Sequence, residues 1–152
     1  MMSHMSEAKA QMLIRRPVRE VFEAFVDPAV TTKFWFTKSS GKLVKGTHVR
    51  WDWEMYGIGA EIEVKEIEEN QRIFLEFDDH TTAEWMFTPR GENETLVTII
   101  NAGFTGSPEE VAKQVIDSTG GFTIVLCGLK ALLEHGIRLN LVADQFPDAR
   151  RR

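Results

Sequence analysis

Apolar residues recur at helical spacing over residues 118–140, which is the most regular pattern in the chain. One face of this segment collects apolar side chains at every third or fourth position: Phe122, Val125, Leu126, Leu129, Leu132, Leu133 and Ile137. The opposite face is charged, with Lys130, Glu134 and Arg138. The spacing predicts a long C-terminal helix. Ser118 or Thr119 is expected to cap its start, because free backbone N–H groups there need an acceptor.

The segments before this helix alternate apolar and polar residues, as half-buried β-strands do. We predict strands over residues 8–15, 47–56, 58–67, 72–77, 81–88 and 94–101. The last of these is apolar on both sides, which is typical of a strand covered on both faces or lying near a dimer contact. Prolines followed by helical spacing predict two short helices, over residues 18–26 and 29–35.

A further helix start lies at Ser107-Pro108-Glu109-Glu110, which combines a capping serine, a first-turn proline and a capping-box glutamate. We expect this helix to run to about residue 117 and to lead into the long one. Polar turns of two to five residues separate most of the strands, and turns of that length connect antiparallel hairpins.

The predicted fold class is therefore α+β. A curved antiparallel sheet of six or seven strands grips the long C-terminal helix, and two short helices follow the first strand. We expect a single domain over residues 8–140. Residues 1–7 are expected to be a tag remnant, and residues 141–152 a C-terminal tail.

Charge and cysteine content narrow the function classes. The net charge is −5 and basic residues are scattered, which disfavours nucleic acid as a partner. No apolar run approaches the roughly 20 residues of a membrane span. The single cysteine, Cys127, excludes an intrachain disulfide and favours a reducing compartment, so a cytoplasmic location is expected.

Several residue patterns stand out in this order of elements: Asp27-Pro28 followed by Phe34-Trp35, Lys45-Gly46-Thr47 opening a strand, and Gly-Phe-X3-Leu-X2-Leu-X2-Leu over residues 121–132. Together with the order of elements, they resemble the START-like, helix-grip superfamily, also called SRPBCC. Within the superfamily, the details are similar to the branch named for the activator of the heat-shock-protein-90 ATPase. The resemblance implies a hydrophobic cavity between sheet and helix. It does not imply one activity, because members include lipid carriers, polyketide aromatase/cyclases, stress proteins, toxin-resistance proteins and co-chaperone domains.

Aromatic and aliphatic residues on the inward faces are the candidate lining of such a cavity, because ligand pockets are mostly apolar and indoles add an N–H donor. The candidates are Trp35, Trp51, Trp53, Met55, Ile62, Phe77, Trp85, Phe87, Phe122, Leu126, Leu129 and Leu133. The alternative is that the same residues only pack a core. Gly128 leaves two explanations open: room for a ligand opposite Trp51 or Trp53, or close packing on the helix over residues 109–117.

Glu54 and Glu61 are candidate polar anchors. Strand alternation places both on the outer face, where carboxylates are solvated. A β-bulge at Gly57 or Gly59 would reverse the alternation and direct one of them into the cavity, where burial would raise its pKa.

Other chemistry finds little support in the sequence. His48, His80 and His135 lack metal-ligand spacing, and Cys127 lies within the long helix rather than at its start. We therefore assign no catalytic residue, metal site or cofactor. The leading hypothesis is a domain that encloses a hydrophobic or aromatic small molecule, lipid- or polyketide-like. The alternatives are a co-chaperone-like module with a chaperone partner, and a cyclase or hydrolase that uses a cavity carboxylate or histidine. Self-association as a homodimer is also expected.

Overall fold

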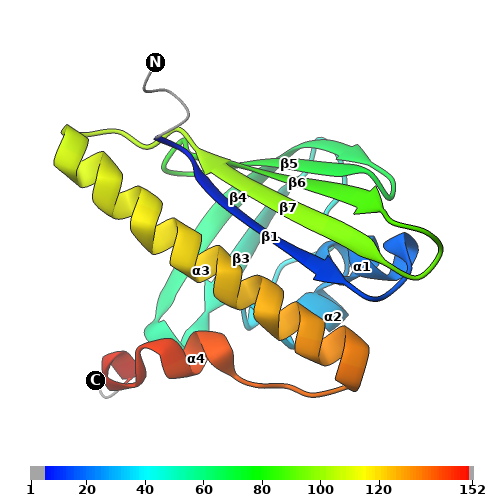
Figure 1. Cartoon of the computed structure of the whole chain (residues 1–152). Helices are drawn as coiled ribbons and strands as arrows, with labels where there is room; N and C mark the ends of the chain where they lie inside the picture. Colours follow the sequence, from blue (N-terminus) through cyan, green and yellow to red (C-terminus); the bar gives the residue numbers. More distant parts are fainter. Residues whose placement is uncertain (1–5, 151–152) are drawn as a thin grey trace.

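The α+β class predicted from the sequence is confirmed in a computed structural model, which describes residues 6–150 (Figure 1). Seven strands form one antiparallel sheet in the order β1-β7-β6-β5-β4-β3-β2. They are β1 Ala8–Ile14, β2 Lys38–Ser39, β3 His48–Trp53, β4 Ile58–Glu68, β5 Arg72–Phe77, β6 Thr82–Pro89 and β7 Thr95–Ala102. The helices are α1 Val18–Val26, α2 Pro28–Thr31, η2 Glu54–Tyr56, α3 Pro108–His135, α4 Leu141–Gln145 and η3 Pro147–Arg150.

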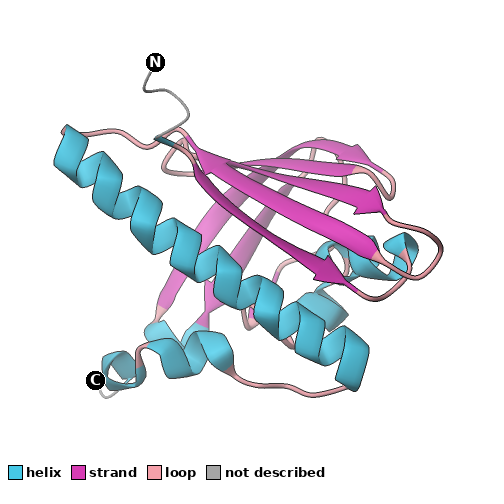
Figure 2. Cartoon of the chain, viewed as in Figure 1, coloured by secondary structure: helices cyan, strands magenta, loops and turns pink. Residues whose placement is uncertain are grey.

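The first and last strands lie side by side in this sheet. Ala8 pairs with Asn101 and Ile14 with Thr95, so β1 closes one edge of the sheet although it is made first. Figure 2 shows the long helix α3 running across the sheet, with its first turns projecting beyond the strands. Residues 1–5 of the expected tag remnant lie outside the described residues.

Strand alternation predicts the inward faces well. Ala83, Trp85 and Phe87 are buried along β6, as are Ile73 and Leu75 along β5. The β-bulge at Gly57 or Gly59 that would turn Glu54 or Glu61 inward is not present, because β3 and β4 pair without a shift up to Trp53 and Ile58. Instead the strand over residues 47–56 ends at Trp53 in the 3-10 turn η2, which Gly57 terminates with φ +64°.

An irregularity in the sheet occurs later, within β4. The register shifts between Val64 and Glu66, where one extra residue enters the strand. The shift lets Val64 and Ile67 both contact the core although they are three residues apart.

The long helix differs from its prediction. The sequence indicated two helices meeting at residue 118, whereas α3 is continuous over 28 residues. Ser118 and Thr119 therefore cap nothing. The cap is Ser107, whose Oγ accepts from the Glu110 N–H at 3.2 Å while Glu110 accepts from the Ser107 N–H at 2.8 Å. Glycines within the helix cost about 1 kcal/mol each but leave its hydrogen bonds intact, so the glycines that follow Thr119 do not end it.

α3 is also long and apolar enough to cross a membrane by length and composition alone. Its residues Val125, Leu126 and Leu129 are buried against the sheet. It is therefore the core helix of a soluble domain.

The segment after Asn140, where a tail was expected, forms α4 and η3. Val142 of α4 packs against the core. The Tyr56 hydroxyl donates to the Val142 carbonyl, and the Tyr56 ring lies 6.4 Å from the Phe146 ring. These contacts hold α4 and the residue after it against η2. Figure 1 shows α4 beside α3, near the C-terminus. Ile137, predicted to extend the apolar face of the long helix, lies beyond the end of α3 and is exposed.

Gly128 fits neither of the two explanations offered by the sequence. A Cβ built there lies 3.4 Å from both Cβ and the carbonyl oxygen of Phe34, in the segment after α2. The missing side chain thus allows α3 to approach that segment closely. It does not face Trp51 or Trp53, and residues 109–117 belong to the same helix.

The free energy of unfolding should therefore depend steeply on the size of the side chain at position 128. Gly128→Leu is expected to lower the free energy of unfolding by about 2 kcal/mol, because its side chain overlaps Phe34. Gly128→Ala places only a Cβ at contact distance and gains helix propensity, so it should stay within about 1 kcal/mol of the parent. Urea denaturation measures both, and a Leu variant as stable as the Ala variant would contradict the close approach.

Candidate functional site

The middle of the interior is filled by aromatic rings rather than hollow. Trp51 stacks on Phe36 with ring centroids 4.4 Å apart, and Trp35 meets Trp51 edge-on at 4.9 Å. The space that these rings share with their neighbours is too small for a water molecule; the residues around it are Phe25, Trp35, Leu43, Trp51, Ile73 and Trp85. At this depth the aromatic residues form a packed core.

An open cleft of about 260 Å³ lies to one side of this core, between the first half of α3, the end of β7 and α4. Its walls are mainly apolar, with the rings of Trp35 and Phe122 in contact at 5.6 Å between centroids. The lining residues are Trp35, Asn101, Ser118, Gly121, Phe122, Val125, Val142 and Gln145. None of these side chains is charged.

Two polar side chains on opposite walls of the cleft, Asn101 and Ser118, are hydrogen-bonded to each other. Asn101 faces inward from β7 and is only 7% exposed. The Ser118 hydroxyl, on α3, donates to Oδ1 of Asn101 at 2.7 Å. Nδ2 of Asn101 donates to the Thr82 carbonyl, also at 2.7 Å. These bonds fix both side chains between α3 and the end of β7.

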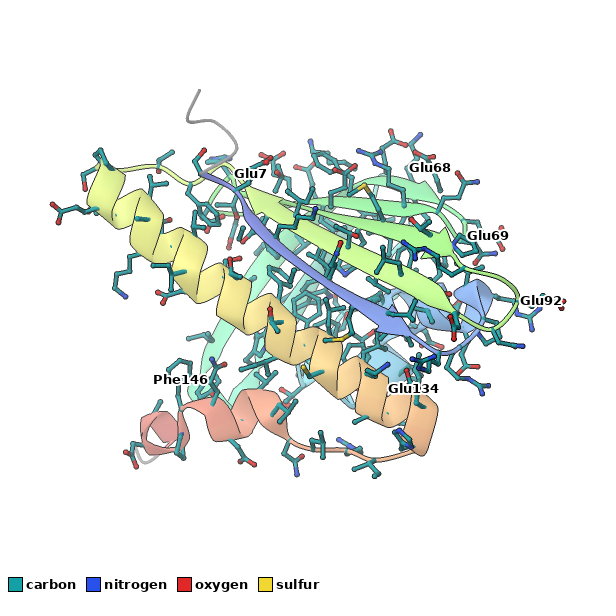
Figure 3. All side chains as sticks on the ribbon, in the orientation of Figure 1. Glu7, Glu68, Glu69, Glu92, Glu134 and Phe146 are labelled. Carbon is teal, nitrogen blue, oxygen red and sulfur yellow. The ribbon has the colours of Figure 1, made fainter. Side chains whose placement is uncertain are left out.

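A second groove, of about 480 Å³, continues from the cleft along the outside of α3 and α4. It shares Gly121 and Gln145 with the cleft, and its other lining residues are Lys113, Ile116, Asp117, Gly120 and Phe146. Ile116 and Phe146 are large apolar residues that stay exposed, and Phe146 lies at the end of α4 (Figure 3). The cleft therefore opens to solvent past α4.

Comparison with known proteins identifies the family. The family model described as "Activator of Hsp90 ATPase homolog 1-like protein" matches residues 15–134. The chain belongs to this family. No curated protein matches the chain in sequence.

Several solved structures share the fold of this family member. Protein SSP2350 from Staphylococcus saprophyticus aligns with a TM-score of 0.77 and 28% identity, over 88% of this chain and 95% of that one. The Aha1 dimer from Colwellia psychrerythraea aligns with a TM-score of 0.74 and 17% identity, over 86% and 97%. The di-domain ARO/CYC BexL aligns with a TM-score of 0.71 and 17% identity, over 84% of this chain but 46% of BexL.

Within this family domain, the predicted lining residues are distributed over four environments. Trp35 and Phe122 line the cleft, and Met55 lines a separate groove of about 70 Å³. Trp53, Phe77 and Leu133 are half-buried and packed against the core. The remaining six are buried within the core: Trp51, Ile62, Trp85, Phe87, Leu126 and Leu129.

The two candidate anchors lie elsewhere. Glu54 is exposed in η2, and Glu61 lies on the outer face of β4. Oε2 of Glu61 accepts from Nη1 of Arg50 at 2.7 Å, and its Oε1 lies 3.4 Å from Nε2 of His48. Hydrogen bonds to Glu61 and Asp52 raise the pKa of the Arg50 guanidinium. The Glu61 carboxylate therefore points away from the interior, because the register shift in β4 comes after this position.

The remaining titratable candidates also lie away from the cleft. His80 is exposed with Nδ1 3.4 Å from Glu76, and His135 lies 4.0 Å from Glu134 at the end of α3. Cys127 is a half-buried free thiol. Over residues 6–150, no group of three or more His, Cys, Asp or Glu side chains could hold a metal ion.

Sequence reasoning missed the polar residues of the cleft. Asn101 was detectable, because Val97 and Ile99 occupy the inward positions of the same strand and alternation places Asn101 next. For Ser118 the sequence predicts a helix cap, whereas its hydroxyl donates to Asn101. Val142 and Gln145 lie in α4, where the sequence has no clear periodicity.

Proposed function

We propose that this domain binds a small hydrophobic or aromatic molecule in the cleft between α3, β7 and α4. The observation that carries the proposal is the space of about 260 Å³ beside Trp35 and Phe122, next to an interior that is otherwise closely packed. Apolar walls provide affinity through burial, at about 25 cal/mol for each Å² removed from water. A few polar groups at one side would then set orientation.

The size of the cleft limits the ligand. An apolar cavity of about 150 Å³ holds one benzene ring, so a space of this size suits about two fused rings. The cleft is open, so a longer ligand would extend into the groove beside Ile116 and Phe146. The likeness to BexL, an ARO/CYC protein of a biosynthetic pathway, supports a polyketide-like ligand over a fatty chain.

The proposal concerns binding rather than catalysis. General acid–base catalysis needs a titratable side chain within reach of the substrate, and the cleft is lined by amides, one hydroxyl and apolar groups. A cytoplasmic location is part of the proposal, and the lone free thiol of Cys127 supports it.

Two protein partners also belong to the proposal. The Colwellia psychrerythraea neighbour is described as a dimer, which supports a homodimer for this chain. The family description supports a chaperone of the Hsp90 type as a second partner. Neither partner requires the cleft.

A titration with 2-methylnaphthalene tests the proposal, since this probe has two rings and no hydrogen-bonding group. We expect saturable binding by isothermal titration calorimetry. Gly121→Leu should weaken it by more than about tenfold, because the new side chain occupies the cleft. A Cβ at Gly121 meets no atom within 4 Å, so the variant should still fold.

Gly120→Leu is the matched control. Gly120 is the preceding residue of the same helix, and a Cβ there also meets no atom within 4 Å. It lines the groove beside Ile116 and Phe146 but not the cleft. Its affinity for the probe should equal that of the parent. Failure of the parent protein to bind, or equal loss in both variants, would overturn the proposed site.

A further inference from the structure

We infer that Asn101 and Ser118 select the ligand: the cleft takes a neutral, flat aromatic molecule that carries a hydroxyl group, and these two side chains bind that hydroxyl. The inference rests on the proposed function, because it names the ligand class of the same cleft. It assigns Asn101 and Ser118 as specificity-determining residues.

The hydrogen-bonding capacity of the pair supports this role. The Ser118 hydroxyl donates its only hydrogen to Asn101, and its oxygen can still accept a hydrogen bond from a ligand. Asn101 uses one amide hydrogen on Thr82 and one oxygen lone pair on Ser118, which leaves one donor and one acceptor. A ligand hydroxyl both donates and accepts, and therefore matches what the pair has left.

Burial strengthens the hydrogen bonds that Asn101 can still make to a ligand. Asn101 is 93% buried, since only 7% of it is exposed, and it stands between apolar neighbours. Hydrogen bonds are stronger in such surroundings than in water, and a ligand lacking a polar group would leave the buried amide partly unsatisfied. The side chain thus discriminates between ligands of the same shape.

The absence of charge from the cleft walls sets the second part of the ligand class. Its eight lining residues include no Lys, Arg or His. A carboxylate or phosphate placed there would lose its hydration without gaining a counter-charge, which is costly. A neutral hydroxyl loses much less hydration free energy than a charged group, so the cleft favours a phenol-like group over an acid.

The helix face fixes how the ligand would lie. Ser118, Phe122 and Val125 follow one another at helical spacing and line the same wall of the cleft. The hydroxyl would meet Ser118 and Asn101 beside β7. The rings would then lie along Phe122 and Trp35, toward the core.

The test compares three probes of the same ring system. We expect 2-naphthol to bind the parent protein roughly 3- to 10-fold more tightly than 2-methylnaphthalene, the range for one neutral hydrogen bond. The anion 2-naphthoate should bind most weakly. In Ser118→Ala the preference for 2-naphthol over 2-methylnaphthalene should fall, because the ligand hydroxyl loses one of its two partners, and in Ser118→Thr, which keeps the hydroxyl, it should return.

Thr123→Ala is the control for loss of a hydroxyl on α3. Thr123 is exposed, bonds only to the Thr119 carbonyl at 2.7 Å and lies outside the cleft, so the preference should be unchanged. Equal affinities for 2-naphthol and 2-methylnaphthalene in the parent, or tightest binding of 2-naphthoate, would overturn the inference while leaving the proposed function standing. If none of the probes binds, the proposed function fails as well.

Discussion

Trp51→Ala should lower the free energy of unfolding by about 3–5 kcal/mol, the range for removing a large aromatic side chain from a packed core. The indole is only 1% exposed and is held by Phe36 and Trp35. If the sequence-based expectation of a ligand cavity at Trp51 held, truncation would enlarge an existing space at small cost. Because the rings are in contact, truncation instead leaves a new void.

Trp53→Ala provides the matched comparison for this variant. Trp53 lies on the same strand and the same face, two residues further along, but is half-buried. Trp53→Ala should lower the free energy of unfolding clearly less than Trp51→Ala does. Guanidinium denaturation followed by circular dichroism measures both. Equal losses, or a tolerated Trp51→Ala, would mean that the interior at Trp51 is not packed as described.

Glu134→Gln should cost about 2–3 kcal/mol at neutral pH, since the carboxylate makes two charge-assisted hydrogen bonds. Its side chain is 10% exposed, and its Oε2 accepts from the Arg15 N–H and from Nζ of Lys130, both at 2.7 Å. Lys130 also donates to the Leu13 carbonyl at 2.8 Å. These bonds hold the end of α3 to the end of β1, where Figure 3 labels Glu134.

The effect of Glu134→Gln should depend on pH. Desolvation raises the pKa of Glu134, but the hydrogen bonds from Arg15 and Lys130 outweigh it, so the pKa is lowered overall. A carboxylate with a lowered pKa stabilises the fold above its unfolded pKa of about 4.3, and the stabilisation disappears as pH falls through the folded value. The stability difference between parent and variant should therefore be complete at pH 7 and shrink below about pH 4.3.

Asp117→Asn is the control for this pH dependence. Asp117 pairs with Lys113 on the same helix at 3.2 Å, but the two side chains are 67% and 79% exposed. Exposed pairs contribute little, so this variant should leave both the stability and its pH profile nearly unchanged. Identical pH profiles for the parent and Glu134→Gln would contradict the role assigned to Glu134.

Much of the fold could be predicted from the sequence because it follows from local periodicity. The pleat of a strand forces side chains to alternate, so the inward positions of Trp85 and Phe87 could be assigned before any pairing was known. The capping box at Ser107 marked the start of α3 for an equally local reason. The continuity of α3 past residue 118 could not be assigned, because a threonine–glycine segment is a typical stop signal when tertiary support is unknown.

The candidate site was harder to predict, because periodicity reports which face a side chain occupies and not how deep it lies. Trp51 and Trp35 share an inward environment, yet Trp51 is stacked on Phe36 while Trp35 reaches the cleft. That difference is set by contacts between residues far apart in the sequence. Asn101 is the exception, since alternation alone would have identified an amide on the inward face.

The pairing of β1 with β7 also has a consequence for synthesis of the chain. Of the seven strands, β1 is synthesised first, but its hydrogen-bonding partner β7, around Asn101, is synthesised last. The sheet cannot close until then, and pairing over such sequence separations slows folding. During this interval β1 is a strand without a neighbour. Its inward residues include the small Ala8 and Ala10, which limits the apolar surface that it offers to other nascent chains.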